Sequence, residues 1–160
     1  MSVTQIAAIL FLATLATIAG AYVFEYGIGL APCELCLTQR IPYYVAIPLA
    51  GLAALLGRAR PNLSRLLLAA FAVAMLVGAG LGVYHAGIEW RFWPGPEACA
   101  AGADTVSGIT DVLKAMREDV VVRCDEAAWR FLGLSLAGWN VLISLALAAL
   151  AARGAARNRP

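Results

Sequence analysis

Four long apolar segments without any acidic or basic residue constrain the fold of this chain more than any other feature. They comprise residues 3–24, 41–57, 66–84 and 131–152. A helix needs about 20 apolar residues to cross the hydrocarbon core of a bilayer, and these segments approach or meet that length. A chain of 160 residues, 62% of them hydrophobic, is too short to wrap four such segments in polar surface as a soluble helical bundle. The sequence therefore predicts an all-α membrane protein, a bundle of four transmembrane helices in a single domain over residues 1–160.

The first segment has one alternative interpretation, a cleaved signal peptide, because Ala19-Gly20-Ala21 weakly resembles a cleavage site. Residues 1–5 carry no Lys or Arg, however, and the apolar run exceeds the roughly 7–15 residues of a signal peptide. We therefore expect residues 3–24 to form the first span.

The second apolar segment, residues 41–57, is short for a span, about 25 Å at about 1.5 Å per residue. We expect this span to begin earlier and to occupy about 37–57, which places Arg40 at the membrane surface. Pro42 fits the first turn of a helix but not its interior. Regular helix is therefore expected to start close to residues 38–41, with Cys36 just before it. The other spans are expected at about 66–85 and 131–152.

The charges predict the orientation of the spans. All ten acidic residues lie within 25–40 and 85–130, whereas the link 57–65 and the tail after residue 152 carry arginines and no acid. Cytoplasmic loops are rich in Lys and Arg, so the link and the tail are expected to be cytoplasmic, with both termini inside. The loops at about 25–36 and 86–130 then face outward.

All four cysteines fall in or at the edge of these outward loops, and they are Cys33, Cys36, Cys99 and Cys124. Disulfides persist on the oxidising side of a membrane and are reduced in the cytosol. The cysteine positions therefore agree with an orientation that was derived from other residues.

Cys33 and Cys36 form a C-x-x-C motif. A disulfide in so small a ring gains little from loop closure, so such pairs are more typical of redox exchange than of stapling. A helix beginning after Cys36, with Arg40 one turn on, predicts Cys36 as the low-pKa thiolate. The alternatives are an inert local disulfide and a zinc site, but zinc needs four clustered ligands and we expect no metal.

Cys99 and Cys124 bracket a segment in which apolar residues recur every three or four positions between 106 and 120. This pattern predicts a short amphipathic helix, lying flat on the membrane or packed on the outward end of the bundle. Alone, the pair could be a structural disulfide, but a C-x-x-C on the same membrane face offers thiol exchange with it.

The sequence has no haem-attachment motif and no nucleotide-binding fingerprint to accept the electrons from the cysteines. A lipid-soluble acceptor, a quinone, is the remaining destination for the electrons.

Several of these features together resemble the disulfide bond formation protein B (DsbB) family. They are Pro32-Cys33-Glu34-Leu35-Cys36 with Arg40 four residues on, a spaced cysteine pair after Pro94-Gly95-Pro96, and Phe131-Leu132-Gly133-Leu134 opening the last span. The similar vitamin K epoxide reductase family has its C-x-x-C after the spaced pair, and the order here is reversed.

The resemblance implies a protein-dithiol:quinone oxidoreductase of the bacterial inner membrane, with its active face in the periplasm. Cys99 would form the mixed disulfide with a periplasmic DsbA-like thiol oxidase, and Cys124 would be reoxidised by exchange with Cys33. Cys36 would react with the quinone, ubiquinone or menaquinone, and Arg40 would stabilise negative charge. His85 lies near the position of a quinone-contacting histidine, although an interfacial His is also ordinary. No nucleic-acid partner is expected.

Two other functions remain open: a membrane reductase that sends electrons to periplasmic disulfides, and a non-enzymatic scaffold stapled by its cysteines. A reductase usually carries cysteines within its spans, and the spans here contain none.

Gly78 and Gly82 form a G-x-x-x-G motif, which predicts close helix packing.

Overall fold

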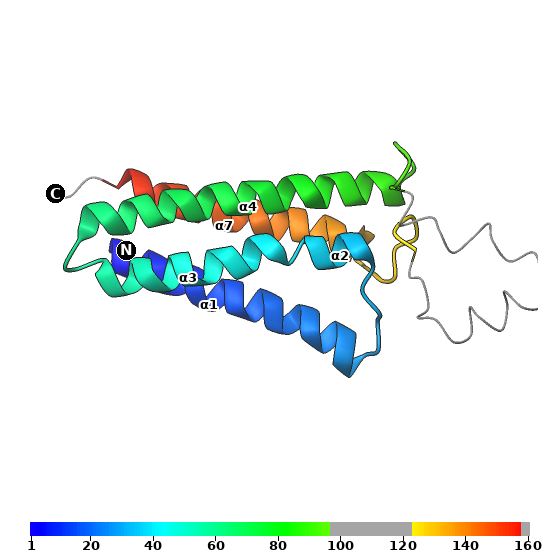
Figure 1. The fold of residues 1–160 in the computed structure, drawn as a ribbon, viewed down its shortest axis with the longest axis horizontal. Coiled ribbons are helices and arrows are strands. Elements are labelled where there is room, and N and C mark those ends of the chain that lie inside the picture. Colours follow the sequence, from blue (N-terminus) through cyan, green and yellow to red (C-terminus); the bar gives the residue numbers. More distant parts are fainter. Residues whose placement is uncertain (97–122, 158–160) are drawn as a thin grey trace, which may run out of the picture.

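The computed structural model describes residues 1–96 and 123–157 and is almost entirely helical (Figure 1). The elements are α1 (Val3–Tyr22), the π-helix η1 (Val23–Gly27), α2 (Glu34–Thr38), α3 (Ile41–Leu56), α4 (Pro61–Glu89), strands β1 (Arg130–Phe131) and β2 (Leu134–Ser135), and α7 (Leu136–Ala156). The amphipathic helix predicted between 106 and 120 lies outside the described residues, as does Cys99.

Three helices in the described part of the chain are long and apolar enough to cross a membrane: Val3–Gly27, Pro61–Glu89 and Leu136–Ala156. Helix α3 has 16 residues and is shorter than a typical span. Large apolar side chains cover the outside of the bundle, with Leu55 79% exposed and Leu66 66% exposed. Such a surface is costly in water and suits a lipid environment, so the fold is that of an all-α membrane protein.

The helix expected to begin after Cys36 and run on into the second apolar segment is interrupted just before that segment. Helix α2 already begins at Glu34, and a turn at Gln39 and Arg40 separates it from α3. Pro42 explains the interruption, because it has no N–H to donate to the carbonyl of Thr38 and its ring would clash there. Cys33 therefore occupies the N-cap of α2, and Cys36 lies inside the helix.

The last helix begins at Leu136 rather than near residue 131, because a hairpin precedes it. Phe131 pairs with Leu134 in an antiparallel register, and the two loop residues Leu132 and Gly133 have φ of 52° and 83°. Positive φ at both positions is the signature of a type I′ turn. The Ser135 side chain then accepts a hydrogen bond from the Gly138 N–H and starts α7.

Helix α4 packs against both α3 and α7, and the predicted close packing at the G-x-x-x-G motif is confirmed. A Cβ added at Gly82 would lie 2.8 Å from Cγ2 of Val141 and 3.2 Å from the carbonyl oxygen of Ala137. A Cβ at Gly78 would lie 3.3 Å from Oγ of Ser144. Both glycines thus let α4 approach α7 closely.

A Gly82→Val variant is expected to lose about 1–3 kcal/mol of stability, the usual cost of overpacking, because α7 offers no room for the side chain. Gly80→Val is the matched control, because a Cβ at Gly80 meets nothing within 4 Å. Thermal unfolding in detergent measures both variants. Equal melting temperatures would show that this glycine contact does not hold α4 against α7.

Candidate functional site

The C-x-x-C pair is held at the start of α2 as two free thiols. The Cys33 and Cys36 sulfurs lie 2.7 Å apart, and Cys33 Sγ also accepts the Cys36 backbone N–H at 3.2 Å. Cys33 is buried, with 3% of its surface exposed, whereas Cys36 is partly buried. The N-cap geometry therefore directs donors at Cys33.

These contacts assign the thiolate to Cys33, and the prediction that Cys36 has the low pKa is wrong. The hydrogen bond from Cys36 is the largest effect and lowers the pKa of Cys33; burial raises it, and the hydrogen bond with His85 lowers it further, so that the net pKa lies below the usual value. The pKa of Cys36 is raised, because its proton is held by Cys33 and because it is buried. The error followed from placing the helix start one turn too late.

Cys124 packs directly against Cys33, although 91 positions separate them in the chain (124 − 33). Cys124 is fully buried, and Leu35 and Cys36 complete this small cluster. Cys124 is disulfide-bonded, and neither Cys33 nor Cys36 is its partner, since both are free. A buried thiolate in contact with a disulfide-bonded cysteine is the arrangement that thiol–disulfide exchange requires.

His85 and Glu89, one turn apart on α4, extend the cysteine cluster. His85 Nε2 lies 3.7 Å from Cys33 Sγ and 3.9 Å from Glu89 Oε1. Both side chains are 4% exposed, and Glu89 Oε2 has no hydrogen-bond partner among the described residues. Arg123 and Glu126, which flank Cys124 in the sequence, also line the space beside the cysteines. Arg123 forms an ion pair with Asp125.

A chain of polar side chains continues from His85 into the bundle. Gln39 Nε2 lies 2.7 Å from His85 Nδ1, and Asn140 Nδ2 donates to Gln39 Oε1 at 2.7 Å. Tyr43 donates to Asn140 Oδ1 at 2.6 Å and lies 2.9 Å from Ser144 Oγ. The segment joining α2 and α3, helix α4 and helix α7 are thereby tied to one buried network.

Arg40 is held on the α1 side of the site. Its Nη1 is 2.6 Å from Glu25 Oε2, and its guanidinium lies 5.1 Å from the centre of the Tyr22 ring. Glu25 belongs to the π-helix η1, a type of distortion often found at functional sites. The charge of Arg40 is therefore balanced by a carboxylate.

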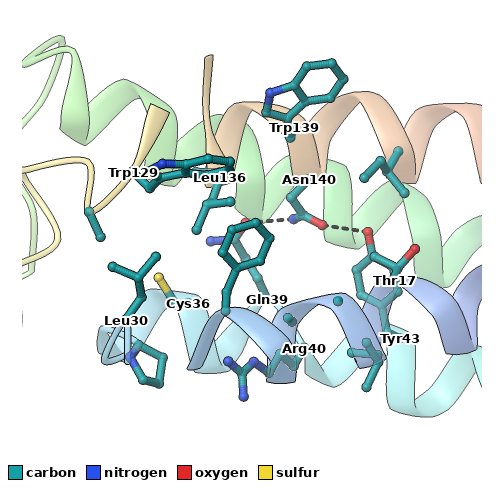
Figure 2. Close-up of a pocket in the computed structure, with 18 of the residues that line it drawn as sticks. Thr17, Leu30, Cys36, Gln39, Arg40, Tyr43, Trp129, Leu136, Trp139 and Asn140 are labelled. Carbon is teal, nitrogen blue, oxygen red and sulfur yellow. Dashed lines mark hydrogen bonds between the residues drawn. The ribbon is translucent and has the colours of Figure 1, made fainter. Parts of the chain in front are cut away.

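A cavity of about 520 Å³ opens beside Cys36, within the range of small-molecule sites. It lies between α1, the α2–α3 segment and α7, where Figure 1 shows α1 diverging from the other helices. Figure 2 shows Cys36 and Arg40 on one wall and Trp139 and Asn140 on the other. Gln39 and His85 also line it, so the cavity reaches the polar network as well as the cysteine pair.

Aromatic rings form much of the cavity wall. Trp129 lies 4.9 Å from Phe24 and 5.9 Å from Phe131, and Phe131 lies 6.0 Å from Trp139, measured between ring centres. All four rings line the cavity. Such a wall suits a flat apolar ring system that stacks on aromatic side chains.

A metal ion would need a different geometry at the cysteine pair. The ligand atoms of Cys33, Cys36 and His85 all lie within 4.8 Å of one another. Two sulfurs bound to one tetrahedral zinc, each at about 2.3 Å, would lie about 3.8 Å apart. The observed separation of 2.7 Å fits a dithiol poised to form a disulfide.

The structure brings together Cys33, Cys36, Cys124 and His85. Arg40 lines the cavity together with Cys36 and His85. Sequence reasoning missed Gln39, Asn140, Glu89 and Glu25. Asn140 had a usable signal, because an amide inside an apolar span marks a functional position. Glu89 also had one, since it follows His85 by four residues on the same helix face.

Comparisons with known proteins identify the family of this chain. The family model "Disulfide bond formation protein DsbB" matches residues 3–153. The disulfide bond formation protein B of Albidiferax ferrireducens is 31% identical over 156 residues, covering 89% of this chain and 86% of that protein. The same-named protein of Verminephrobacter eiseniae is 32% identical, covering 94% and 86%.

A third relative, the disulfide bond formation protein B of Aromatoleum aromaticum, is 29% identical and covers 94% of this chain and 93% of its own. No solved structure matches the chain. The match extends over nearly the whole chain and includes the C-x-x-C pair, Cys124 and the cavity. The chain therefore belongs to the disulfide bond formation protein B (DsbB) family.

Proposed function

We propose that this protein oxidises the dithiol of a periplasmic thioredoxin-fold protein (DsbA-like) and passes the electrons to a membrane quinone. In the net reaction two thiols become a disulfide, and a quinone takes two electrons and two protons to become a quinol. The partner's thiolate reduces the Cys99–Cys124 disulfide, and this pair then reduces the Cys33–Cys36 disulfide. The resulting Cys33–Cys36 dithiol reduces the quinone.

The observation that carries the proposal is the position of Cys33 and Cys36 between Cys124 and the cavity. Cys33 contacts Cys124 on one side, and Cys36 lines the aromatic-walled cavity on the other. Electrons entering as thiols at Cys124 can therefore leave at Cys36 without a large movement of the chain. A ubiquinone or menaquinone ring is flat and lipid-soluble, which suits the cavity.

We also infer the arrangement in the bilayer. The segment α2–turn–α3 supplies a fourth crossing at about 37–57, and the loops at about 25–36 and 86–130 face the periplasm. Figure 1 shows the start of α1, the end of α7 and the arginine-rich α3–α4 link at one end of the bundle and the cysteine-bearing α2 at the other, which supports a cytoplasmic and a periplasmic end. The amphipathic helix would lie on the periplasmic side.

Arg40 would stabilise negative charge developing on the quinone, in competition with Glu25 for its guanidinium. An Arg40→Ala variant is therefore expected to raise the quinone KM about tenfold, since a hydrogen bond to a charged group is worth about 1.5–3 kcal/mol. Partner oxidation in a single turnover should change little. Glu25→Gln is the control, because it frees Arg40 and should not raise KM. An unchanged KM in Arg40→Ala would remove Arg40 from the quinone site.

The proposal is tested with purified protein in lipid nanodiscs, a reduced thioredoxin-fold oxidase and a soluble quinone. Loss of the oxidised-quinone absorbance, with one partner disulfide formed per quinone, is the expected result. No loss of quinone, with reduction of an oxidised partner instead, would favour a membrane reductase. No redox change at all would favour a scaffold.

A further inference from the structure

The direction of each hydrogen bond in the buried polar network fixes the proton on His85. Two backbone carbonyls, which can only accept, determine the orientation of both amides. Gln39 Nε2 donates to the Leu35 carbonyl at 3.2 Å, and Asn140 Nδ2 donates to the Gly78 carbonyl at 3.4 Å. The amide nitrogens are therefore assigned without reference to the histidine.

The remaining contacts follow from these two assignments. Asn140 Oδ1 accepts from Tyr43, and the second Asn140 N–H donates to Gln39 Oε1. The second Gln39 N–H then points at His85 Nδ1, at 2.7 Å. A donor at this distance requires Nδ1 to be the unprotonated acceptor, so the ring proton is on Nε2.

Nε2 is the ring nitrogen that faces the redox site. Its neighbours include Cys33 Sγ at 3.7 Å and Glu89 Oε1 at 3.9 Å, both acceptors when ionised. The backbone of Cys124 also forms a hydrogen bond with the His85 ring. We propose that Gln39 and Asn140 are positioning residues that hold His85 in its Nε2–H tautomer, so that His85 donates a hydrogen bond to the Cys33 sulfur. His85 then stabilises the Cys33 thiolate of the reduced pair and does not act as its base.

The tautomer of His85 is inferred from the hydrogen bonds alone. Its role in thiol–disulfide exchange rests on the proposed function. The tautomer also assigns different tasks to the two faces of the imidazole. Nδ1 is occupied by Gln39, and Nε2 is directed at sulfur. A metal bound through Nε2 would need the opposite tautomer, which the Gln39 orientation disfavours.

The chain has one histidine, so selective labelling with ¹⁵N-histidine gives the spectrum of His85 alone, provided that the affinity tag contains no histidine. With the C-x-x-C pair reduced at neutral pH, we expect a pyridine-type Nδ1 signal and a pyrrole-type Nε2 signal. A protonated Nδ1 in the unmodified protein would overturn the inference. This measurement needs no variant, so it decides the question even if the variants fail to fold.

Two variants test the positioning role. Gln39→Glu replaces the donor beside Nδ1 with an acceptor and is expected to protonate Nδ1. Asn140→Asp places a carboxylate oxygen against Gln39 Oε1, and the repulsion between these oxygens opposes the bond that holds Gln39 Nε2 at the Leu35 carbonyl. The Gln39 amide should therefore rotate and Nδ1 should again become protonated, although residue 140 is linked to His85 through Gln39. Ser144→Ala is the control, because Ser144 contacts the Tyr43 hydroxyl and the Asn140 oxygen but not the Asn140 N–H that donates to Gln39, so the tautomer should not change. Unchanged Nδ1 signals in both folded variants would contradict the proposal.

Site-resolved alkylation of the reduced protein, read by mass spectrometry across pH, reports the consequence at Cys33. Loss of the hydrogen bond to the thiolate is expected to lower the acid dissociation constant of Cys33 about tenfold or more in Asn140→Asp, so the pKa of Cys33 rises and its alkylation moves to higher pH. An unaltered Cys33 profile with an altered tautomer would show that His85 does not act on this sulfur. The Nε2–H tautomer without quinone reduction would overturn the proposed function alone, and quinone reduction with a protonated Nδ1 would overturn this inference alone.

Discussion

A Cys36→Ser variant is expected to lose quinone reduction by more than about a thousandfold, the scale seen when a covalent nucleophile is removed. Cys36 is the only cysteine among the described residues that lines the 520 Å³ cavity, so no other described sulfur can deliver electrons there. The rate is measured as loss of quinone absorbance with excess reduced partner. The partner protein should accumulate in its reduced form.

Thr38→Ser is the matched control, because Thr38 lies on the same short helix and its hydroxyl bonds to the Glu34 carbonyl. It should reduce quinone at the unmodified rate. Sustained quinone reduction by Cys36→Ser would mean that the electrons leave by a route other than the one proposed.

A side chain that fills the cavity is expected to weaken quinone binding strongly. Gly20 lines the cavity, and a Cβ at this position meets nothing within 4 Å, so a Gly20→Leu side chain enters the space without a clash at its root. We expect the quinone KM to rise at least about tenfold, a loss of about 1.4 kcal/mol of binding free energy. Helix stability should not fall, because Leu is favoured over Gly in a helix by up to about 1 kcal/mol.

Gly80→Leu separates this effect from a general response to a glycine substitution. Gly80 is also open at its Cβ position, but it lies on α4 and does not line the cavity. Its quinone KM and melting temperature should match those of the unmodified protein. A normal KM in Gly20→Leu would place the quinone elsewhere.

The helical membrane architecture followed from the sequence because apolar runs report on local structure. The turn between α2 and α3 was partly foreseeable from Pro42, yet the start of α2 at Glu34 depends on a cap formed by the Cys33 sulfur itself. Helix propensities do not include a thiol as an N-cap, so they could not favour a helix that begins at Glu34 over one that begins after Cys36. The thiolate was therefore assigned to the wrong cysteine of the pair.

The cysteines and His85 were identified as candidates because their chemistry is recognisable one residue at a time. The network around them was not, because its members come from distant parts of the chain: Asn140 meets Gln39 only when α7 packs beside the α2–α3 turn. Likewise, the pairing of Arg40 with Glu25 depends on where η1 ends the first helix. Tertiary packing decides such contacts, and local sequence patterns do not encode it.

The contact between Cys33 and Cys124 is the central claim, and one measurement tests it most directly. In the Cys36→Ser protein with its Cys99–Cys124 disulfide intact, the Cys33 thiolate can attack the Cys124 sulfur, forming a Cys33–Cys124 disulfide and releasing Cys99 as a thiol. Without Cys36 no neighbouring thiol can reopen the new bond by closing the C-x-x-C disulfide, so the Cys33–Cys124 disulfide should accumulate. Non-reducing digestion and mass spectrometry are expected to recover the peptide pair that contains Cys33 and Cys124. Recovery of Cys33 only as a free, alkylated thiol, with Cys124 linked solely to Cys99, would contradict the account.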